Sequence, residues 1–329
     1  MKINLSIAAP VRPPRFRRAS LAIALSALGA LATLAGCSSS DPTGTTAGGT
    51  IADSAGATGA NAGSATLVVG SQAYYSNEIV AEIYSEALEA GGYKVDRQFQ
   101  IGQREVYLPE ITEGKIDVFP EYIGSLLQAV NKSAPDGKTD AVYENLKKAL
   151  PAGLTALTPS AASDQNSWTV TKAFADKYKL TDLASLKNVT EPITVGGNSE
   201  LETRPYGPKA LADKYAIKTK GFKAVEDSGG PLTVKALTSG AIQLANIYTA
   251  DPNISTNNLV ALDDPDGLFL PDNIAPIVSS KVDDSAKRIL NRVSGALTQA
   301  DFVKLNAESI NDKKSSKDIA AKWLAAHPA

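Results

Sequence analysis

The chain has 329 residues, of which 43% are apolar, and its 33 basic and 35 acidic residues give a formal net charge of −2. A cluster of arginines lies near the N-terminus, so the rest of the chain is more acidic and lacks the basic stripe that nucleic-acid binding requires. The single cysteine, Cys37, and the single histidine, His327, exclude an internal disulfide and a Cys/His structural metal site.

Residues 1–37 have the order of a secretory signal: a basic cluster that includes Arg17 and Arg18, an apolar run over 21–35, then small residues. The run is too short for a membrane span, which needs about 20 strongly apolar residues. It ends in Leu-Ala-Gly-Cys, which resembles the lipobox of bacterial lipoproteins. The resemblance implies that Cys37 carries lipid and anchors an extracytoplasmic protein to the cell membrane. An incidental thiol is the alternative, and the arginine pair leaves twin-arginine export open.

Residues 38–65 consist almost entirely of Ser, Thr, Gly, Ala and Asp. Such a segment cannot bury enough apolar surface to fold, so it is expected to be a disordered tether. The folded part is then expected to begin near residue 66.

From residue 66, strand patterns alternate with helical patterns, which favours a parallel or mixed α/β sheet. The first block predicts strands over 67–70, 93–101 and 116–119, and helices over 77–90 and 106–113 and after Pro120. A second block predicts strands over 168–171, 193–196 and 242–247, and helices over 173–178, 209–215 and 234–237. An apolar segment over 275–279 and helices over 286–297, 301–306 and 318–326 follow. Two α/β units with a helical C-terminus result, and periodicity alone leaves their topology open.

Several segments resemble the glycine betaine, carnitine and choline binding proteins of ABC importers, the osmoprotectant-receptor family. They are Gly-Ser-Gln at 70–72, Gly-Lys-Ile-Asp-Val-Phe-Pro-Glu-Tyr-Ile-Gly-Ser at 114–125, Glu-Thr-Arg-Pro-Tyr-Gly at 202–207, Ile-Tyr-Thr-Ala-Asp at 247–251, Leu-Asp-Asp-Pro at 262–265, Leu-Asn at 305–306 and Ile-Ala-Ala-Lys-Trp-Leu at 319–324. Each motif alone is weak, but together they run in order along the whole mature chain.

The resemblance implies an α/β fold with two lobes, joined by two hinge strands, that close over a solute in the cleft between them. Carried over, lobe 1 comprises 66–163 and 272–329, and lobe 2 comprises 164–271. The implied partners are a small solute and an ABC permease in the membrane, and the receptor is expected to be a monomer without a cofactor.

The resemblance also implies which residues bind the solute. Tyr122 and Tyr248 match tyrosines that surround a quaternary ammonium group, which favours aromatic faces because it has no N–H donors. Arg204 matches an arginine that binds the solute carboxylate, for which a guanidinium is well shaped. Asp164 matches an acid near the cation, although it could instead start a turn. Each tyrosine could also be an ordinary core residue.

Three further candidate binding residues depart from the family pattern. Asn166 and Asn273 stand where tyrosines are common, and Gln72 replaces a lysine. An amide supplies donors and an acceptor but no aromatic face. The sequence therefore predicts weak binding of plain glycine betaine and a solute with more hydrogen-bonding groups. The rings of Tyr74, Tyr75, Trp168 and Tyr206 are candidates to replace the missing aromatic surface.

The leading hypothesis is therefore a non-enzymatic solute receptor for a betaine-type osmoprotectant. The same receptor could serve a larger betaine or a non-betaine polar solute. A cell-envelope enzyme is the remaining alternative, but the sequence contains no Ser/His/Asp or Cys/His set and no phosphate-binding loop. The adjacent acids Asp263 and Asp264 would point apart in a strand or turn, so they make a poor acid/base pair.

Overall fold

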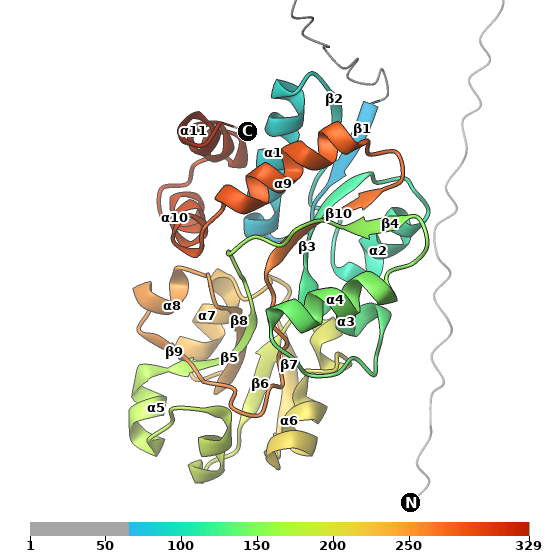
Figure 1. Cartoon of the computed structure of the whole chain (residues 1–329). Helices are drawn as coiled ribbons and strands as arrows, with labels where there is room; N and C mark the ends of the chain where they lie inside the picture. The colour runs from blue at the N-terminus through green and yellow to red at the C-terminus, as the bar shows by residue number, and fades with distance from the viewer. Residues whose placement is uncertain (1–65, 329) are drawn as a thin grey trace, which may run out of the picture. The chain divides into compact units, whose positions relative to one another are not determined.

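The computed structural model describes residues 66–328, so the predicted signal, Cys37 and the tether lie outside the described residues. The described chain forms two five-stranded sheets, each flanked by helices (Figure 1). The predicted α/β fold class with two lobes is confirmed. No helix within 66–328 is both long and apolar enough to cross a membrane.

The first sheet has the strand order β2-β1-β3-β10-β4. Its strands are β1 (Thr66–Gly70), β2 (Lys94–Gln98), β3 (Val118–Tyr122), β4 (Leu154–Ala156) and β10 (Ile274–Ser279). Its helices are α1 (Tyr75–Ala90), α2 (Arg104–Thr112), α3 (Ile123–Val130), α4 (Thr139–Ala149), α9 (Asp284–Ala296), α10 (Gln299–Ile310) and α11 (Ser316–Ala326). β1 pairs in parallel with β2 and β3, whereas β10 is antiparallel to both β3 and β4. The chain thus returns to this sheet after building the second one.

The second sheet has the strand order β7-β6-β8-β5-β9. Its strands are β5 (Asn166–Thr171), β6 (Thr194–Gly197), β7 (Gly221–Ala224), β8 (Leu244–Tyr248) and β9 (Leu259–Ala261). Its helices are α5 (Lys172–Tyr178), α6 (Pro208–Tyr215), α7 (Pro231–Thr238) and α8 (Asn253–Thr256), with 3-10 helices η1 (Leu183–Asn188) and η2 (Ser199–Glu202). β5 is antiparallel to both β8 and β9.

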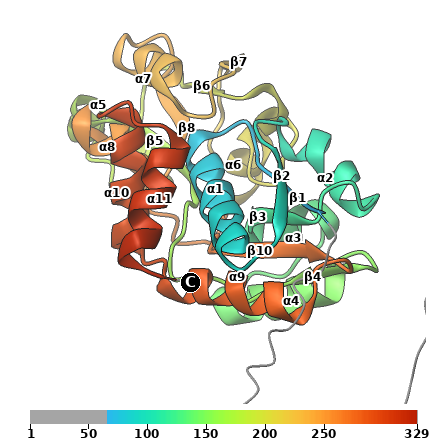
Figure 2. The same cartoon turned by 90° about the horizontal axis from the view of Figure 1, so that it is seen from above.

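Each sheet has apolar side chains packed on both faces, because successive strand residues point to opposite sides. In β3, Val118 packs into a cluster with α1 and α9, whereas Phe119 packs into a cluster with α2, α3 and α4. In β8, Leu244 and Ala245 divide in the same way between two clusters. α1 lies against α9, α10 and α11, so the N-terminal and C-terminal helices share one layer (Figure 2).

The chain crosses between the sheets twice, over 157–165 and over 262–273. An isolated antiparallel bridge joins the two crossings at Ser163 and Asn273. The neighbouring residues Asp164 and Asp272 are therefore held at the junction between the sheets.

Most predicted strands have ends that differ from the structure by one to three residues, and two of them are described here. The strand predicted over 93–101 ends at Gln98, since Gln100 has a positive φ of 55° that does not continue a strand. The strand predicted from Ile116 begins at Val118, and just before it the Asp117 side chain accepts the backbone N–H of Val68 at 3.0 Å.

Candidate functional site

A cavity lies between the two sheets, and we call it the inner cavity. Its lining residues are Gln72, Tyr74, Arg104, Tyr122, Ser125, Asp164, Asn166, Arg204, Tyr206, Tyr248 and Asp272. The structure thus brings together every sequence-predicted binding residue except Asn273. The volume is about 10 Å³, which is room for about one water molecule. Its walls must therefore separate before a solute of betaine size can occupy it.

Four tyrosines line the inner cavity, and three of them lie next to the ends of helices or strands. Tyr74 precedes α1, Tyr122 ends β3 and Tyr248 ends β8, so both sheets contribute. The Tyr74 and Tyr248 ring centroids lie 4.7 Å apart. Burial raises the pKa of all three hydroxyls above the usual range, so the rings stay neutral. Neutral aromatic faces of this kind attract a poorly solvated cation.

Asp164 supplies a buried acid beside these rings, with 2% of the residue exposed. It accepts the backbone N–H of Ala250 at 2.9 Å and the Ser76 hydroxyl at 3.0 Å. Burial raises its pKa to about 7, although the two hydrogen bonds oppose this shift. A cationic solute would therefore bind more tightly when Asp164 is charged than when it is protonated.

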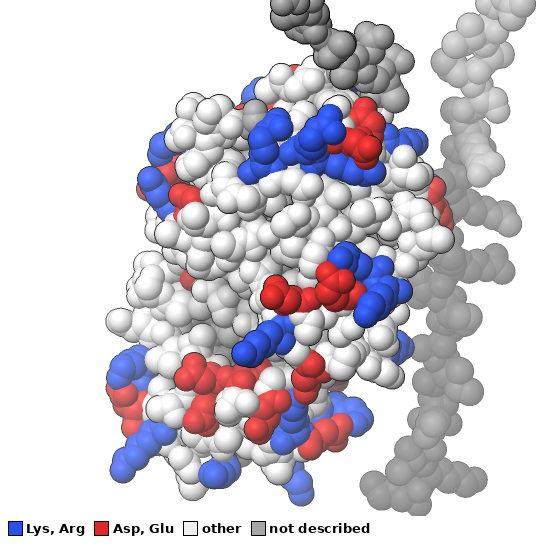
Figure 3. Space-filling model, in the orientation of Figure 1, with Lys and Arg blue, Asp and Glu red and all other residues white. Residues whose placement is uncertain are grey.

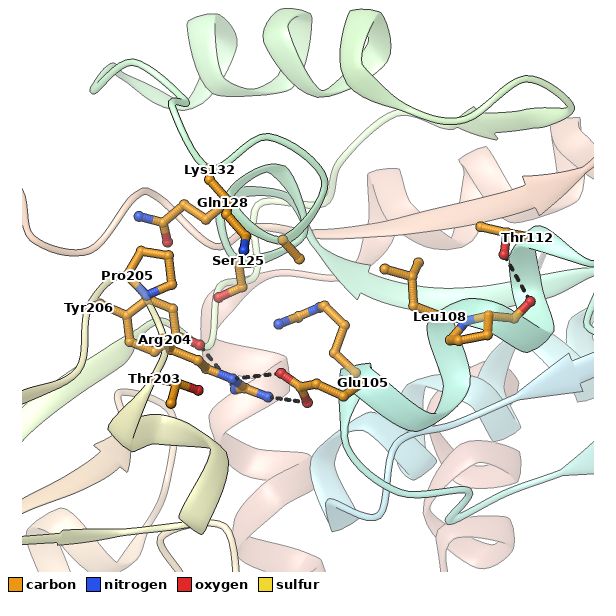
Figure 4. Close-up of a pocket in the computed structure, with 13 residues that line it drawn as sticks. Glu105, Leu108, Thr112, Ser125, Gln128, Lys132, Thr203, Arg204, Pro205 and Tyr206 are labelled. Carbon is orange, nitrogen blue, oxygen red and sulfur yellow. Dashed lines mark hydrogen bonds and ion pairs between the residues drawn. The ribbon is translucent and has the colours of Figure 1, made fainter. Parts of the chain in front are cut away.

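Arg204 lies at the rim of the inner cavity, where its guanidinium already holds a carboxylate of the protein. Its Nη2 lies 3.0 Å from Glu105 Oε2 on α2, and its Nη1 donates to the Tyr206 hydroxyl at 3.0 Å (Figure 4). The Arg204 side chain is 12% exposed, whereas that of Glu105 is 56% exposed. A solute carboxylate would therefore compete with an exposed, weakly held protein carboxylate for the same donors.

Arg104 lines the inner cavity but was not predicted from the sequence. Its Nε and Nη2 donate to the two Glu121 oxygens, each at 2.9 Å, and the Tyr107 hydroxyl donates to Glu121 at 2.6 Å. Arg104 is 6% exposed and Glu121 is 0% exposed. A charged residue in an amphipathic helix ordinarily suggests a solvated face, so the sequence offered no signal for this buried pair.

Asn273 is the predicted binding residue that the structure places outside the inner cavity. Its Nδ2 donates to the backbone oxygen of Ser160 at 3.0 Å, and its Oδ1 accepts the Thr139 hydroxyl at 3.2 Å. The preceding residue, Asp272, lines the cavity instead. Because neighbouring residues of an extended chain face opposite sides, a shift of one position exchanges them.

The other aromatic candidates divide between site and core. Tyr206 lines the inner cavity together with Tyr74. Trp168 is fully buried in the core of the second sheet. The Tyr75 hydroxyl donates to Asp251 at 3.3 Å, as the Tyr74 hydroxyl does at 3.2 Å.

A larger outer cleft of about 730 Å³ adjoins the inner cavity. It lies between α2, α3 and the segment 203–206, and Gln128 and Lys132 border it on the α3 side (Figure 4). It shares Ser125, Arg204 and two other lining residues with the inner cavity. The outer cleft and the inner cavity therefore adjoin at these four residues.

A close approach of two chain segments fixes the start of α3 in this wall. A Cβ added to Gly124 would lie 2.6 Å from both Leu270 Cβ and Pro271 O. Only glycine permits this approach, and it brings the Ser125 backbone N–H within 2.6 Å of Asp272 Oδ1.

The face shown in Figure 3 carries both acidic and basic side chains. Among residues 66–328, no group of three or more His, Cys, Asp or Glu side chains could hold a metal ion.

Comparisons with known proteins agree with this architecture. The chain is 28% identical over 281 residues to the glycine betaine-binding protein YehZ of Escherichia coli (strain K12), covering 78% of this chain and 88% of that protein. It is 24% identical over 270 residues to the carnitine transport binding protein OpuCC of Listeria monocytogenes serotype 1/2a (strain 10403S), covering 79% and 86%. A crystal structure described as a glycine betaine/carnitine/choline ABC transporter matches the fold with a TM-score of 0.65, at 18% identity, over 79% of this chain and 98% of that one.

A family described as the substrate binding domain of ABC-type glycine betaine transport systems matches residues 65–326. This match confirms the predicted class, a substrate-binding component of an ABC importer. Its members are receptors that act outside the cytoplasm, where they bind small solutes and deliver them to a permease. Because the match covers all but the last two described residues, the chain belongs to this family of ABC-type glycine betaine substrate-binding domains.

Proposed function

We propose that the inner cavity captures a small zwitterionic solute that carries a quaternary ammonium group and a carboxylate. The observation that carries this proposal is the wall of Tyr74, Tyr122 and Tyr248 around the Asp164 carboxylate, with Arg204 at the rim. Each ring contact to a cation contributes about 0.5–2 kcal/mol, and more when water is excluded. A guanidinium binds a carboxylate with charge-assisted hydrogen bonds. The relatives named for glycine betaine and carnitine support the same class of solute.

The proposed lobes are 66–163 with 272–329, and 164–271. Lining residues come from both, since Tyr122 belongs to the first lobe and Tyr248 to the second. A solute between them would favour the arrangement in which both lobes touch it, and this population shift is the signal for the permease. The direct test is titration calorimetry of the purified protein with quaternary ammonium zwitterions. Absence of heat and of thermal stabilisation with all of them would contradict the proposed function.

Arg204→Ala is expected to weaken binding of such a zwitterion by about 1.5–3 kcal/mol, the usual range for a hydrogen bond to a charged group. The companion variant Glu105→Gln removes the carboxylate that competes for the same donors, so its affinity is expected to equal or exceed that of the unmodified protein. Calorimetric dissociation constants for the three proteins check both expectations. Equal affinity in Arg204→Ala and the unmodified protein would exclude a role for Arg204 in carboxylate binding.

We also propose that the receptor is a monomer and that lipid on Cys37 holds it at the cell membrane. The Leu-Ala-Gly-Cys sequence at 34–37 supports the anchor. Several buried acyl chains suffice for stable anchoring, since each buried CH2 contributes about 0.8 kcal/mol. Cys37→Ala is expected to abolish membrane retention, leaving released protein or an uncleaved precursor. Cell fractionation and intact-protein mass measure this, and an unchanged mass and membrane fraction would refute the lipid anchor.

A further inference from the structure

Two amides that line the inner cavity each bury a polar atom that has no hydrogen-bond partner among residues 66–328. These atoms are the Gln72 side-chain nitrogen, Nε2, and the Asn166 side-chain oxygen, Oδ1. The residues are 7% and 5% exposed. An unpaired buried polar atom costs about 1–3 kcal/mol, and most such atoms in proteins are paired. Both atoms therefore mark positions where a bound solute can supply a partner.

A chain of hydrogen bonds fixes which end of the Asn166 amide remains unpaired. The Ser125 hydroxyl donates its single hydrogen to Asp272 Oδ2 at 2.6 Å, while the Ser125 backbone N–H donates to Asp272 Oδ1. Ser125 Oγ can then only accept, and it does so from Asn166 Nδ2 at 3.3 Å. Turning the amide over would place two acceptors against each other. Asn166 Oδ1 is thus the end left without a partner.

The sheet register directs this amide toward the solute. Asn166 on β5 stands directly opposite Tyr248 on β8 in an antiparallel pair. Directly opposed residues present their side chains on the same face, with Cβ atoms about 4.5–5.5 Å apart. The Asn166 amide and the Tyr248 ring therefore share one wall of the inner cavity.

We propose that the solute of this receptor carries, besides its cation and carboxylate, a hydroxyl or N–H group that donates a hydrogen bond to Asn166 Oδ1. This inference rests on the proposed function and narrows its substrate class. Gln72 Nε2 supplies a donor to an acceptor atom of the same solute. A quaternary ammonium group has no hydrogen to donate, so a zwitterion without a further donor leaves Asn166 Oδ1 buried and unpaired. A site built to pair with a solute hydroxyl or N–H discriminates strongly against an analogue that lacks it.

The test uses two matched pairs of solutes and the unmodified mature protein. The first pair is 3-hydroxy-4-trimethylammoniobutanoate and 4-trimethylammoniobutanoate, which differ by one hydroxyl. The second is trimethylhistidine with a ring N–H and the same compound methylated on a ring nitrogen. In at least one pair the donor-bearing member is expected to bind tenfold or more tightly. If all four solutes bind and neither pair differs by more than threefold, the inference is overturned while the proposed function stands. If none binds, the proposed function itself fails.

The variant Asn166→Leu tests whether Asn166 Oδ1 causes the preference for the donor-bearing solute, because leucine keeps the side-chain size and removes the acceptor. The preference for the donor-bearing solute is expected to vanish in this variant through weaker binding of that solute alone. The matched control is Asn273→Leu, whose amide bonds Thr139 and Ser160 outside the inner cavity and which should retain the preference. A preference that survives in Asn166→Leu would overturn the assignment. If that variant does not fold, the comparison in the unmodified protein decides alone.

Discussion

Asp164→Asn is expected to lower the affinity for a cationic zwitterion by about tenfold or more at pH 8, because unit charges near a protein surface interact by several kcal/mol at about 4 Å. Asp164 is 2% exposed, so water does not screen it. Asparagine keeps the size of the side chain, its Oδ1 can still accept the Ala250 N–H, and its Nδ2 can donate to the Ser76 hydroxyl oxygen. The loss of affinity therefore measures the effect of the Asp164 charge. Calorimetry at pH 8 measures it.

The same variant is expected to flatten the pH profile of binding. Burial raises the pKa of Asp164 to about 7 from its ordinary value of 3.8, so in the solute-free protein the charged form grows as the pH rises through 7. Affinity for a cation is therefore expected to increase from pH 5.5 to pH 8 and then remain constant.

The stability of the solute-free protein is expected to change in the opposite direction. The folded state holds this proton more tightly than the unfolded state, so the contribution of Asp164 to folding falls as the pH rises from about 4 to 7.

Two other buried carboxyls, Asp251 and Asp272, also raise the pKa of Asp164 by their charge, and Asp272 titrates in the lower part of this range. Burial raises the pKa of Asp272 to about 6, and it also raises that of Asp251. Arg204 remains charged throughout. Asp272→Asn is therefore the control, and it should retain the rise in affinity between pH 6.5 and 8. An identical pH profile in Asp164→Asn and the unmodified protein would show that Asp164 does not contact the cation.

Glu121→Ala is expected to destabilise the fold by about 3–5 kcal/mol, the cost of leaving one charge of a buried ion pair without its partner. Three polar groups lose their acceptor in this variant: the Arg104 guanidinium, the Tyr107 hydroxyl and the backbone N–H of Tyr122. Urea unfolding of the two proteins measures the difference. The effect should exceed that of any exposed ion pair in the described chain.

Glu113→Ala is the matched control, since Glu113 pairs with Lys115 and both side chains are more than half exposed. Its effect is expected to stay within about 0.5 kcal/mol, as for other surface pairs. Replacing Arg104 and Glu121 together by leucine should recover part of the stability, because neither charge of this pair is then left buried without its partner. A loss below about 1 kcal/mol in Glu121→Ala would mean that water reaches Arg104 and solvates it.

The sequence predicted those strands and helices in which the periodic pattern of apolar residues extends over enough positions to be recognised. α1 has eleven buried residues among its 16 and ends before two glycines, so its extent could be predicted. β4 and β9 have three residues each, and β7 is largely exposed. These edge strands carry too little apolar pattern to recognise, since their place depends on a neighbouring strand. α4 was missed as well, because only Val142 and Leu146 are buried along it.

The residues of the inner cavity also fall into those that the sequence predicted and those that it did not. Tyr122 and Tyr248 end strands, and such positions carry over with the motifs around them. Arg104, Ser125 and Asp272 enter the inner cavity only because α2, α3 and the second crossing meet there. No local pattern encodes that meeting. The structure places Asp272 rather than Asn273 in the lining of the inner cavity, since one residue of register along an extended segment reverses the side that a side chain faces.

The return of the chain to its first sheet determines the order in which the protein can fold. β5 to β9 are contiguous in sequence, so the second sheet can assemble as soon as residue 261 is available. The first sheet needs β10, and α1 needs α9, α10 and α11 to cover it. Contacts of such long sequence separation form slowly, because a large loop must close before they contribute. α1, the earliest helix of the described chain, therefore acquires its neighbours last.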